Sequence, residues 1–164
     1  EPVSALVAEA YDIGMRVQLD PTLILAVMAI ESGFNPFAQS PVGAQGLMQV
    51  MTRVHSDKYQ NFGGKFAAFD PLSNLRVGVK VLQDCIRIAG STEGGLKNYV
   101  GAGNTQDDGG YAGKVMAEHA RLKQVAAGRP VPVTTPAPAP TAGSTIVPES
   151  PDTESAKVAT VAMN

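Results

Sequence analysis

Residues 23–31 read Leu23-Ile24-Leu25-Ala26-Val27-Met28-Ala29-Ile30-Glu31, eight apolar residues followed directly by a carboxylate. Such a run leaves a helix no polar face, so we expect this helix to be buried on every side. Asp20-Pro21 just before the run is typical of an N-cap followed by proline at the first helical position, and Gly33 favours a helix end. The stretch therefore predicts a buried helix over residues 22–32.

The Glu31 carboxylate stands in an unusual place, at the C-terminal end of that helix. Desolvation disfavours its charge and the negative end of the helix dipole repels it, so both effects raise its pKa above the ordinary value of about 4.3. A carboxyl group that keeps its proton near neutral pH can act as a general acid. The alternative is a helix end that simply emerges into water, which is commoner for a glutamate after an apolar run.

Most of the first 127 residues repeat the three-and-four spacing of apolar residues that indicates helices. The spacing predicts helices over 3–17, 71–89, 92–100 and 110–126, and a further short helix over 43–51. Asp70-Pro71 repeats the cap-and-proline opening, and Gly90 favours the end of the longest helix. Alternation typical of strands is lacking, so the sequence predicts an all-α domain.

Composition changes after Ala127. Seven of the 12 prolines lie between Pro130 and Pro151, and no aromatic residue follows Tyr111. Proline-rich segments of this kind do not bury enough apolar surface to offset the cost of ordering the chain. We therefore expect a catalytic or binding domain over 1–127 and a disordered Pro/Ala/Thr-rich tail or linker over 128–164.

Charge and cysteine content exclude several classes of protein. The net charge of -2 leaves no basic footprint for nucleic acid, and one cysteine excludes an intramolecular disulfide scaffold. Two histidines are too few for a histidine-based metal centre without carboxylate help.

The longest apolar run is far shorter than the roughly 20 residues that span a bilayer, so no transmembrane segment is expected. No signal peptide opens the chain, and we expect any export signal to have been removed.

Two motifs follow the buried helix: the pair Glu31-Ser32 and, about fifteen residues later, Gly46-Leu47-Met48-Gln49. Further on, Asp70-Pro71 is followed by Asn74 and Gly78. In this order the motifs resemble the soluble lytic transglycosylase (SLT) family, enzymes that cleave peptidoglycan glycan strands, and the match covers most of residues 1–127. The resemblance implies a lysozyme-like helical fold, akin to goose-type lysozyme, and no cofactor.

The same resemblance implies a reaction that uses a single acid. Glu31 protonates the glycosidic oxygen between N-acetylmuramic acid and N-acetylglucosamine, and the acetamido group of the substrate stabilises the anomeric carbon. Glu31 then takes the proton of the muramoyl C6 hydroxyl, giving a 1,6-anhydro product. Ordinary glycosidases need two carboxylates, and no second one stands near the motif in sequence.

The resemblance also assigns substrate-binding residues. Ser40 and Tyr99 are implied to hold and polarise Glu31 or the reacting sugar, while Met48 and Gln49 line the glycan groove. Tyr111 is similar to the family's final tyrosine, and we rank it below Tyr99 as a substrate contact. Taken alone, either tyrosine could equally serve in ordinary packing.

Two other functions remain open on the sequence. A hydrolytic muramidase on the same fold would carry a second carboxylate over the cleft. A non-catalytic peptidoglycan-binding or scaffold module would keep the groove with an idle acid. Val100 stands where asparagine is usual in the family, and it is the feature that favours this second reading.

The implied substrate also suggests where the protein works. Peptidoglycan lies outside the cytoplasm, so the resemblance implies a periplasmic or exported bacterial protein. We expect the proline-rich tail to act as a tether to a cell-envelope or secretion apparatus.

Overall fold

Helices dominate the computed structural model, which describes residues 2–104 and 107–133. The part of the predicted tail from residue 134 onward lies outside the described residues. In chain order the elements are α1 (Pro2–Val17), α2 (Pro21–Ser32), β1 (Ala44–Gln45), β2 (Val50–Met51), α3 (Ser56–Tyr59), two short 3₁₀ helices, η1 (Gln60–Phe62) and η2 (Lys65–Phe69), then α4 (Pro71–Ala89), α5 (Thr92–Tyr99) and α6 (Tyr111–Ala126).

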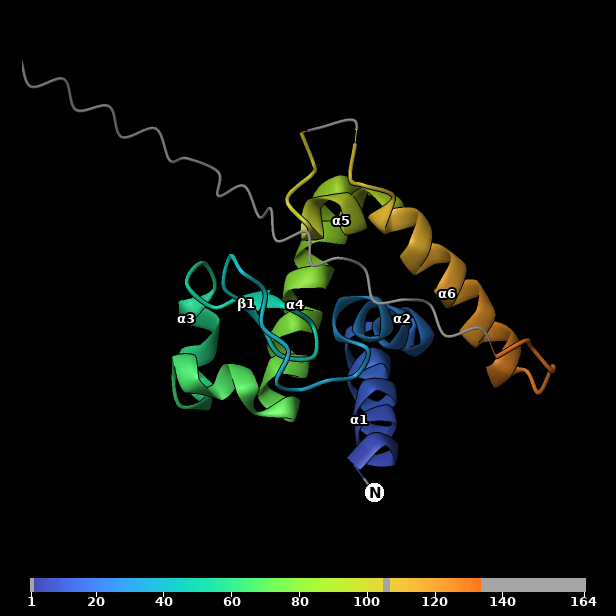
Figure 1. The fold of residues 1–164 in the computed structure, drawn as a ribbon, viewed down its shortest axis with the longest axis horizontal. Coiled ribbons are helices and arrows are strands. Elements are labelled where there is room, and N and C mark those ends of the chain that lie inside the picture. Colours follow the sequence, from blue (N-terminus) through green and yellow to red (C-terminus); the bar gives the residue numbers. More distant parts are fainter. Residues whose placement is uncertain (1, 105–106, 134–164) are drawn as a thin grey trace, which may run out of the picture.

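The long helix α4 runs through the middle of the molecule (Figure 1). The small strands and α3 lie on one side of it, and α1, α2 and α6 lie on the other. Helices α1 and α6 both pack against α2, while α5 packs against α4. None of the helices in the described ranges combines the length and the apolar character that a membrane span requires.

Helix α2 has the environment that its sequence predicts. Every residue from 23 to 28 is buried. The Asp20 carboxylate caps the N-terminus by accepting a hydrogen bond from the Thr22 backbone N–H at 2.9 Å. Gly33 ends the helix in the left-handed conformation with φ 57°, and its N–H donates to the Ala29 carbonyl. Both end signals and the buried character are therefore confirmed.

Residues 43–51 do not form the predicted helix. They fold into a two-stranded antiparallel hairpin, with Ala44 opposite Met51 and Gln45 opposite Val50. Positive φ angles at residues 43, 46 and 49 interrupt any helical path. The apolar residues of this stretch are buried, which explains why the segment looked helical from its composition. The all-α class holds, because the sheet contains only two residues per strand.

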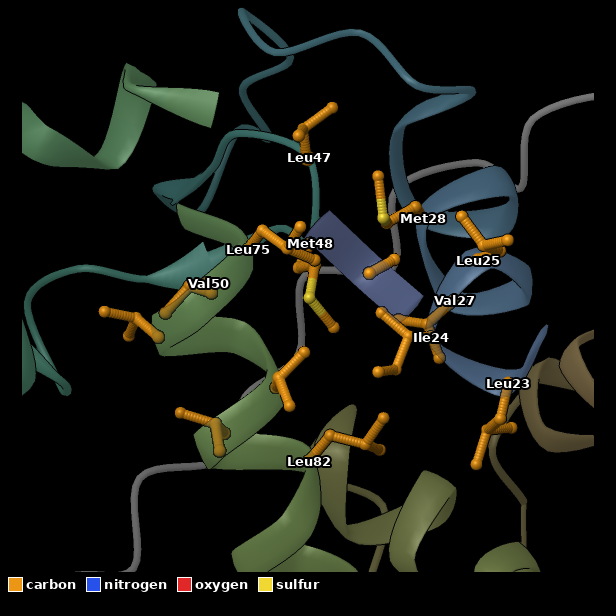
Figure 2. Close-up of a cluster of buried hydrophobic side chains, with 14 of the residues drawn as sticks. Leu23, Ile24, Leu25, Val27, Met28, Leu47, Met48, Val50, Leu75 and Leu82 are labelled. Carbon is orange, nitrogen blue, oxygen red and sulfur yellow. The ribbon is translucent and has the colours of Figure 1, made fainter. Parts of the chain in front are cut away.

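The hairpin and the loop within it close the space between α2 and α4. Figure 2 shows side chains of the hairpin and its loop beside those of the two helices, and all of them belong to one buried cluster: Leu47 and Met48 from the loop, Val50 from β2, Ile24, Val27 and Met28 from α2, and Leu75 and Leu82 from α4. A Cβ atom at Gly78 would lie 2.6 Å from side-chain atoms of Met48. A side chain at position 78 would therefore force Met48 or the backbone of α4 to move.

The Asn74 side chain of α4 fixes the loop by its backbone. Its Oδ1 accepts from the Met48 N–H at 2.8 Å, and its Nδ2 donates to the Gln45 carbonyl at 2.8 Å and to the Tyr59 hydroxyl oxygen at 3.0 Å. Gly46 passes so close that a Cβ atom there would lie 2.4 Å from Asn74. Asn74 is fully buried, so each of these backbone groups depends on it in place of water.

We expect Asn74→Ala to lower the free energy of unfolding by about 2–4 kcal/mol, because it removes the partner of the buried Met48 N–H and of the partly buried Gln45 carbonyl. The measurement is urea unfolding of the two proteins. The matched control is Asn61→Ala, at an exposed asparagine, with an expected change within about 0.5 kcal/mol. Equal stability of the two variants would contradict the structural importance of Asn74.

Candidate active site

Glu31 is the second-to-last residue of α2, where the buried helix reaches the surface of the core. Part of its surface stays accessible, although protein atoms surround its carboxyl group closely. Burial raises the pKa of Glu31, and a hydrogen bond from Tyr111 lowers it by a smaller amount. The net effect is a pKa raised from 4.5 to about 7. The group can therefore exist as an acid or as a carboxylate near neutral pH.

Tyr111 is the hydrogen-bond donor to this carboxyl group. Its hydroxyl donates to Glu31 Oε1 at 2.6 Å. Tyr111 is the first residue of α6 and is 8% exposed, so the packing of α6 against α2 carries the hydroxyl to the acid. The bond stabilises the carboxylate form and orients one of its oxygens.

Two hydrogen bonds, one from the Glu-Ser pair and one from α5, hold the loop that carries the second motif. The Ser32 hydroxyl donates to the Leu47 carbonyl at 2.8 Å, and the Tyr99 hydroxyl donates to the Met48 carbonyl at 2.7 Å. The two sequence motifs are thus in direct contact, 15 residues apart along the chain. Sequence reasoning singled out Ser32 as part of a motif but did not predict that it anchors this loop.

Neither of the hydroxyls that were expected to hold Glu31 is bonded to it within the described part of the chain. The Ser40 hydroxyl accepts from the Ala44 N–H at 2.9 Å and so braces its own loop, where Ser40 is 4% exposed. Tyr99 is bonded to Met48. The structure thus makes Tyr111, which we ranked lower, the partner of the acid. A contact of Ser40, Tyr99 or Tyr111 with a sugar remains a prediction.

Met48 and Gln49, which are expected to line the groove, have different surroundings in the structure. The Met48 side chain is fully buried in the core, so the structure shows it as packing. Gln49 is 7% exposed and has a positive φ of 47°. Its Nε2 donates to the carbonyls of Ala38 and Gly46, both at 3.0 Å, while its Oε1 is buried without a hydrogen-bond partner. The substrate contacts of both residues remain predictions.

The arrangement offers one carboxyl group for acid–base chemistry. Among the described residues, no second carboxylate is among the groups that shift the pKa of Glu31. Residues 2–104 and 107–133 also hold no cluster of three histidine, cysteine or acidic side chains suited to a metal ion. The site can therefore donate a proton and take one back through the same residue.

Comparison with known proteins agrees with this geometry. Residues 10–120 match the family described as Transglycosylase SLT domain. The chain belongs to this family. The matched range contains Glu31, the loop that carries Gln49 and Tyr111, so the whole described site is part of the SLT domain.

Individual relatives match over part of their length. A protein named "Transglycosylase" from Enterobacteria phage PRD1 is 35% identical over 105 residues, which is 62% of this chain and 38% of the phage protein. The type IV secretion system protein virB1 of Brucella abortus is 29% identical over 47% of this chain and 44% of its own length. Membrane-bound lytic murein transglycosylase C of Photorhabdus laumondii is 40% identical over 42% of this chain and 21% of its own length. The chain thus spans less than half of each of these relatives.

The burial of Glu31 predicts a pH-dependent cost to stability. A carboxyl group whose pKa is higher in the folded than in the unfolded protein destabilises the fold as the pH rises from about 4.5 to 7, because the unfolded state gives up its proton first. We expect Glu31→Gln to raise the free energy of unfolding at pH 8 by up to about 3 kcal/mol, with little gain at pH 4. Urea unfolding at the two pH values measures it. A gain that is the same at both would contradict the raised pKa of Glu31.

Proposed function

We propose that this SLT-family chain is a peptidoglycan lytic transglycosylase, which cleaves the β-1,4 bond between N-acetylmuramic acid and N-acetylglucosamine. The observation that carries the proposal is a single carboxyl group whose pKa lies near 7, held by Tyr111 beside the two family motifs. The names of the phage and murein transglycosylase relatives support the same reaction class.

In the first step Glu31 acts as a general acid. Its proton moves to the glycosidic oxygen while the bond from the muramoyl C1 to that oxygen breaks, and the N-acetylglucosamine part leaves as an alcohol. The acetamido oxygen of the muramoyl residue shares the positive charge at C1. The Tyr111 hydroxyl, at 2.6 Å from Oε1, stabilises the negative charge that Glu31 acquires.

In the second step Glu31 acts as a base. Its carboxylate takes the proton of the muramoyl C6 hydroxyl while that oxygen bonds to C1, which returns Glu31 to the acid form. Every atom of the product comes from the substrate, and no water is added. A pKa near 7 suits both steps, because the group must give up a proton and regain it within one turnover.

The proposed substrate also suggests the cellular compartment in which the protein works. An enzyme of peptidoglycan works in the periplasm or after export. Because the virB1 relatives are named as type IV secretion system proteins, we propose that this chain acts beside a secretion or cell-envelope apparatus, with residues 128–164 as the tether.

Products released from purified peptidoglycan test the reaction. We expect wild-type protein to release anhydromuropeptides, lighter by one water than hydrolysis products, and Glu31→Gln to release none. Glu93→Gln, at an exposed glutamate on α5, is the matched control and should match wild type. Mass spectrometry distinguishes the outcomes. Reducing-end products would assign a muramidase instead, and an inactive but folded wild type would favour a binding module.

The pH dependence of the rate tests the role of Tyr111. Protonated Glu31 starts the reaction, so kcat/KM should fall as the pH rises through about 7. Tyr111→Phe removes the hydrogen bond that lowers the pKa of Glu31, so we expect this alkaline limb to move up by about one pH unit. Tyr11→Phe, at an exposed tyrosine of α1, should leave it in place. A limb unchanged by Tyr111→Phe would show that Tyr111 does not control the acid.

A further inference from the structure

Two side-chain hydrogen bonds join α6 to α2, and they lie at opposite ends of α2. At the end of α2, the Tyr111 hydroxyl donates to Glu31 Oε1 at 2.6 Å. At its start, His119 Nε2 lies 3.1 Å from Oδ2 of the N-cap residue Asp20. The proposed reaction uses the first bond and gives no role to the second.

The Asp20 carboxylate contacts both helices, one with each oxygen. Its Oδ1 accepts from the Thr22 N–H and caps α2, while its Oδ2 faces His119 of α6. Burial raises the pKa of Asp20, but hydrogen bonds from Thr22 and His119 outweigh burial, so the net pKa is below its usual value. An ionised carboxylate can only accept hydrogen bonds, so His119 Nε2 carries the hydrogen and donates it.

Of the two α6 side chains that face this carboxylate, His119 is the more sheltered from water. Its side chain is 14% exposed, whereas that of Lys123, at 3.8 Å from the same oxygen, is 61% exposed. Water screens an exposed ion pair, so Lys123 adds little to the contact. The directional link between α6 and the start of α2 is therefore the His119 hydrogen bond.

The spacing of these residues shows how α6 crosses α2. Asp20 and Glu31 are eleven residues apart, which is about three helical turns, so both face the same side of α2. Tyr111 and His119 are eight residues apart, roughly 12 Å along α6. The beginning of α6 thus lies beside the end of α2, and the middle of α6 lies beside the start of α2. Two separate points therefore fix the position of α6 along α2.

The start of α6 has its other polar ties to its own loop. Gly110 at the N-cap has no side chain to cap the helix, and the Asp108 carboxylate accepts from the N–H groups of Gly110 and Ala112, each at 2.9 Å. These bonds do not reach α2. A hydrogen bond weakens steeply as its distance and angle change, so a small displacement of α6 along α2 would weaken the bond from Tyr111 to Glu31.

We propose that His119 is a positioning residue of the active site, whose bond to Asp20 fixes α6 along α2 and so keeps the Tyr111 hydroxyl on Glu31. His119 does not touch the acid and acts on it through α6. Its importance for catalysis rests on the proposed function, in which Glu31 gives up a proton and regains it.

Tyr111 is the group through which this effect reaches Glu31. Among the described residues, the tyrosines whose pKa responds to the charge of Glu31 are Tyr111 and Tyr99. Burial raises the pKa of both, so both are neutral at pH 7. Tyr99 donates its hydrogen to the Met48 carbonyl, whereas Tyr111 donates to the acid itself. Looser packing of α6 therefore changes the pKa of Glu31 by weakening the bond from Tyr111.

Two variants at position 119 test the proposal. His119→Gln places an amide N–H where Nε2 lies and keeps the bond to Asp20, whereas His119→Asn is one methylene shorter and does not reach it. Both side chains are neutral, so the comparison is free of any change in charge. We expect the pKa of Glu31 in His119→Asn to exceed that in His119→Gln by about 0.3–0.5, a two- to threefold change in its acid dissociation constant.

The measurement is a ¹³C NMR titration of protein labelled at its glutamate carboxyl carbons. The Glu31 resonance is the one that Glu31→Gln lacks, and it reports the protonation of Glu31 alone. Gln124→Asn makes the same one-methylene change at an exposed position of α6, and it should leave the pKa of Glu31 at the wild-type value. A residue that only stabilises the fold would lower the free energy of unfolding without changing this pKa in the folded protein.

A second comparison uses Tyr111→Phe as the background. With the Tyr111 hydroxyl gone, His119→Asn and His119→Gln should give the same pKa of Glu31. Equal pKa values with Tyr111 present would overturn the inference, and so would a difference that persists in Tyr111→Phe. The titration needs no substrate. A pKa difference in a protein that releases no anhydromuropeptides would therefore contradict the proposed function and leave the positioning by His119 in place.

Discussion

The buried carboxamide of Asn74 is the constraint on which the rest of the site depends. A loop that enters the core must satisfy its backbone groups without water, and Asn74 does this from α4 for the Met48 N–H and the Gln45 carbonyl. With those two groups held, the carbonyls of Leu47 and Met48 are available to Ser32 and Tyr99. The Asn74 side chain therefore sets the path of the loop. The loop in turn connects α2 and α5, because its carbonyls accept hydrogen bonds from a residue of each helix.

The acid is adjusted by helix packing rather than by neighbouring charges. Helix α2 ends inside the protein and leaves Glu31 poorly solvated, which favours the protonated form. Helix α6 brings Tyr111 against it, which favours the carboxylate. The pKa near 7 results from this opposition. The residue is thereby suited to exchange a proton in both directions, at a cost to stability above its unfolded-state pKa.

Sequence reasoning succeeded where the signal is local. The apolar run with Asp20 and Gly33 at its ends defined α2, and the position of Glu31 after it correctly predicted a raised pKa. It failed over 43–51, because apolar content there reflects burial held by Asn74, which is 26 residues from Met48 in the chain. It also did not predict the hydrogen bond from Tyr111 to Glu31, since only the packing of α6 on α2 shows which hydroxyl reaches the acid; the ranking of Tyr99 above Tyr111 as a sugar contact stays a prediction. The unpartnered oxygen of Gln49 has no counterpart in a sequence pattern.

Val100, the feature that favoured an idle groove, has an ordinary packing role in the structure. It follows α5 at the C-cap, where its N–H donates to the Leu96 carbonyl at 3.3 Å and its side chain packs, partly buried, against the core. The neighbouring Tyr99 still reaches the Met48 carbonyl, and the acid is held from a different helix by Tyr111. Valine at this position is therefore compatible with the hydrogen bonds that fix the loop and orient the acid.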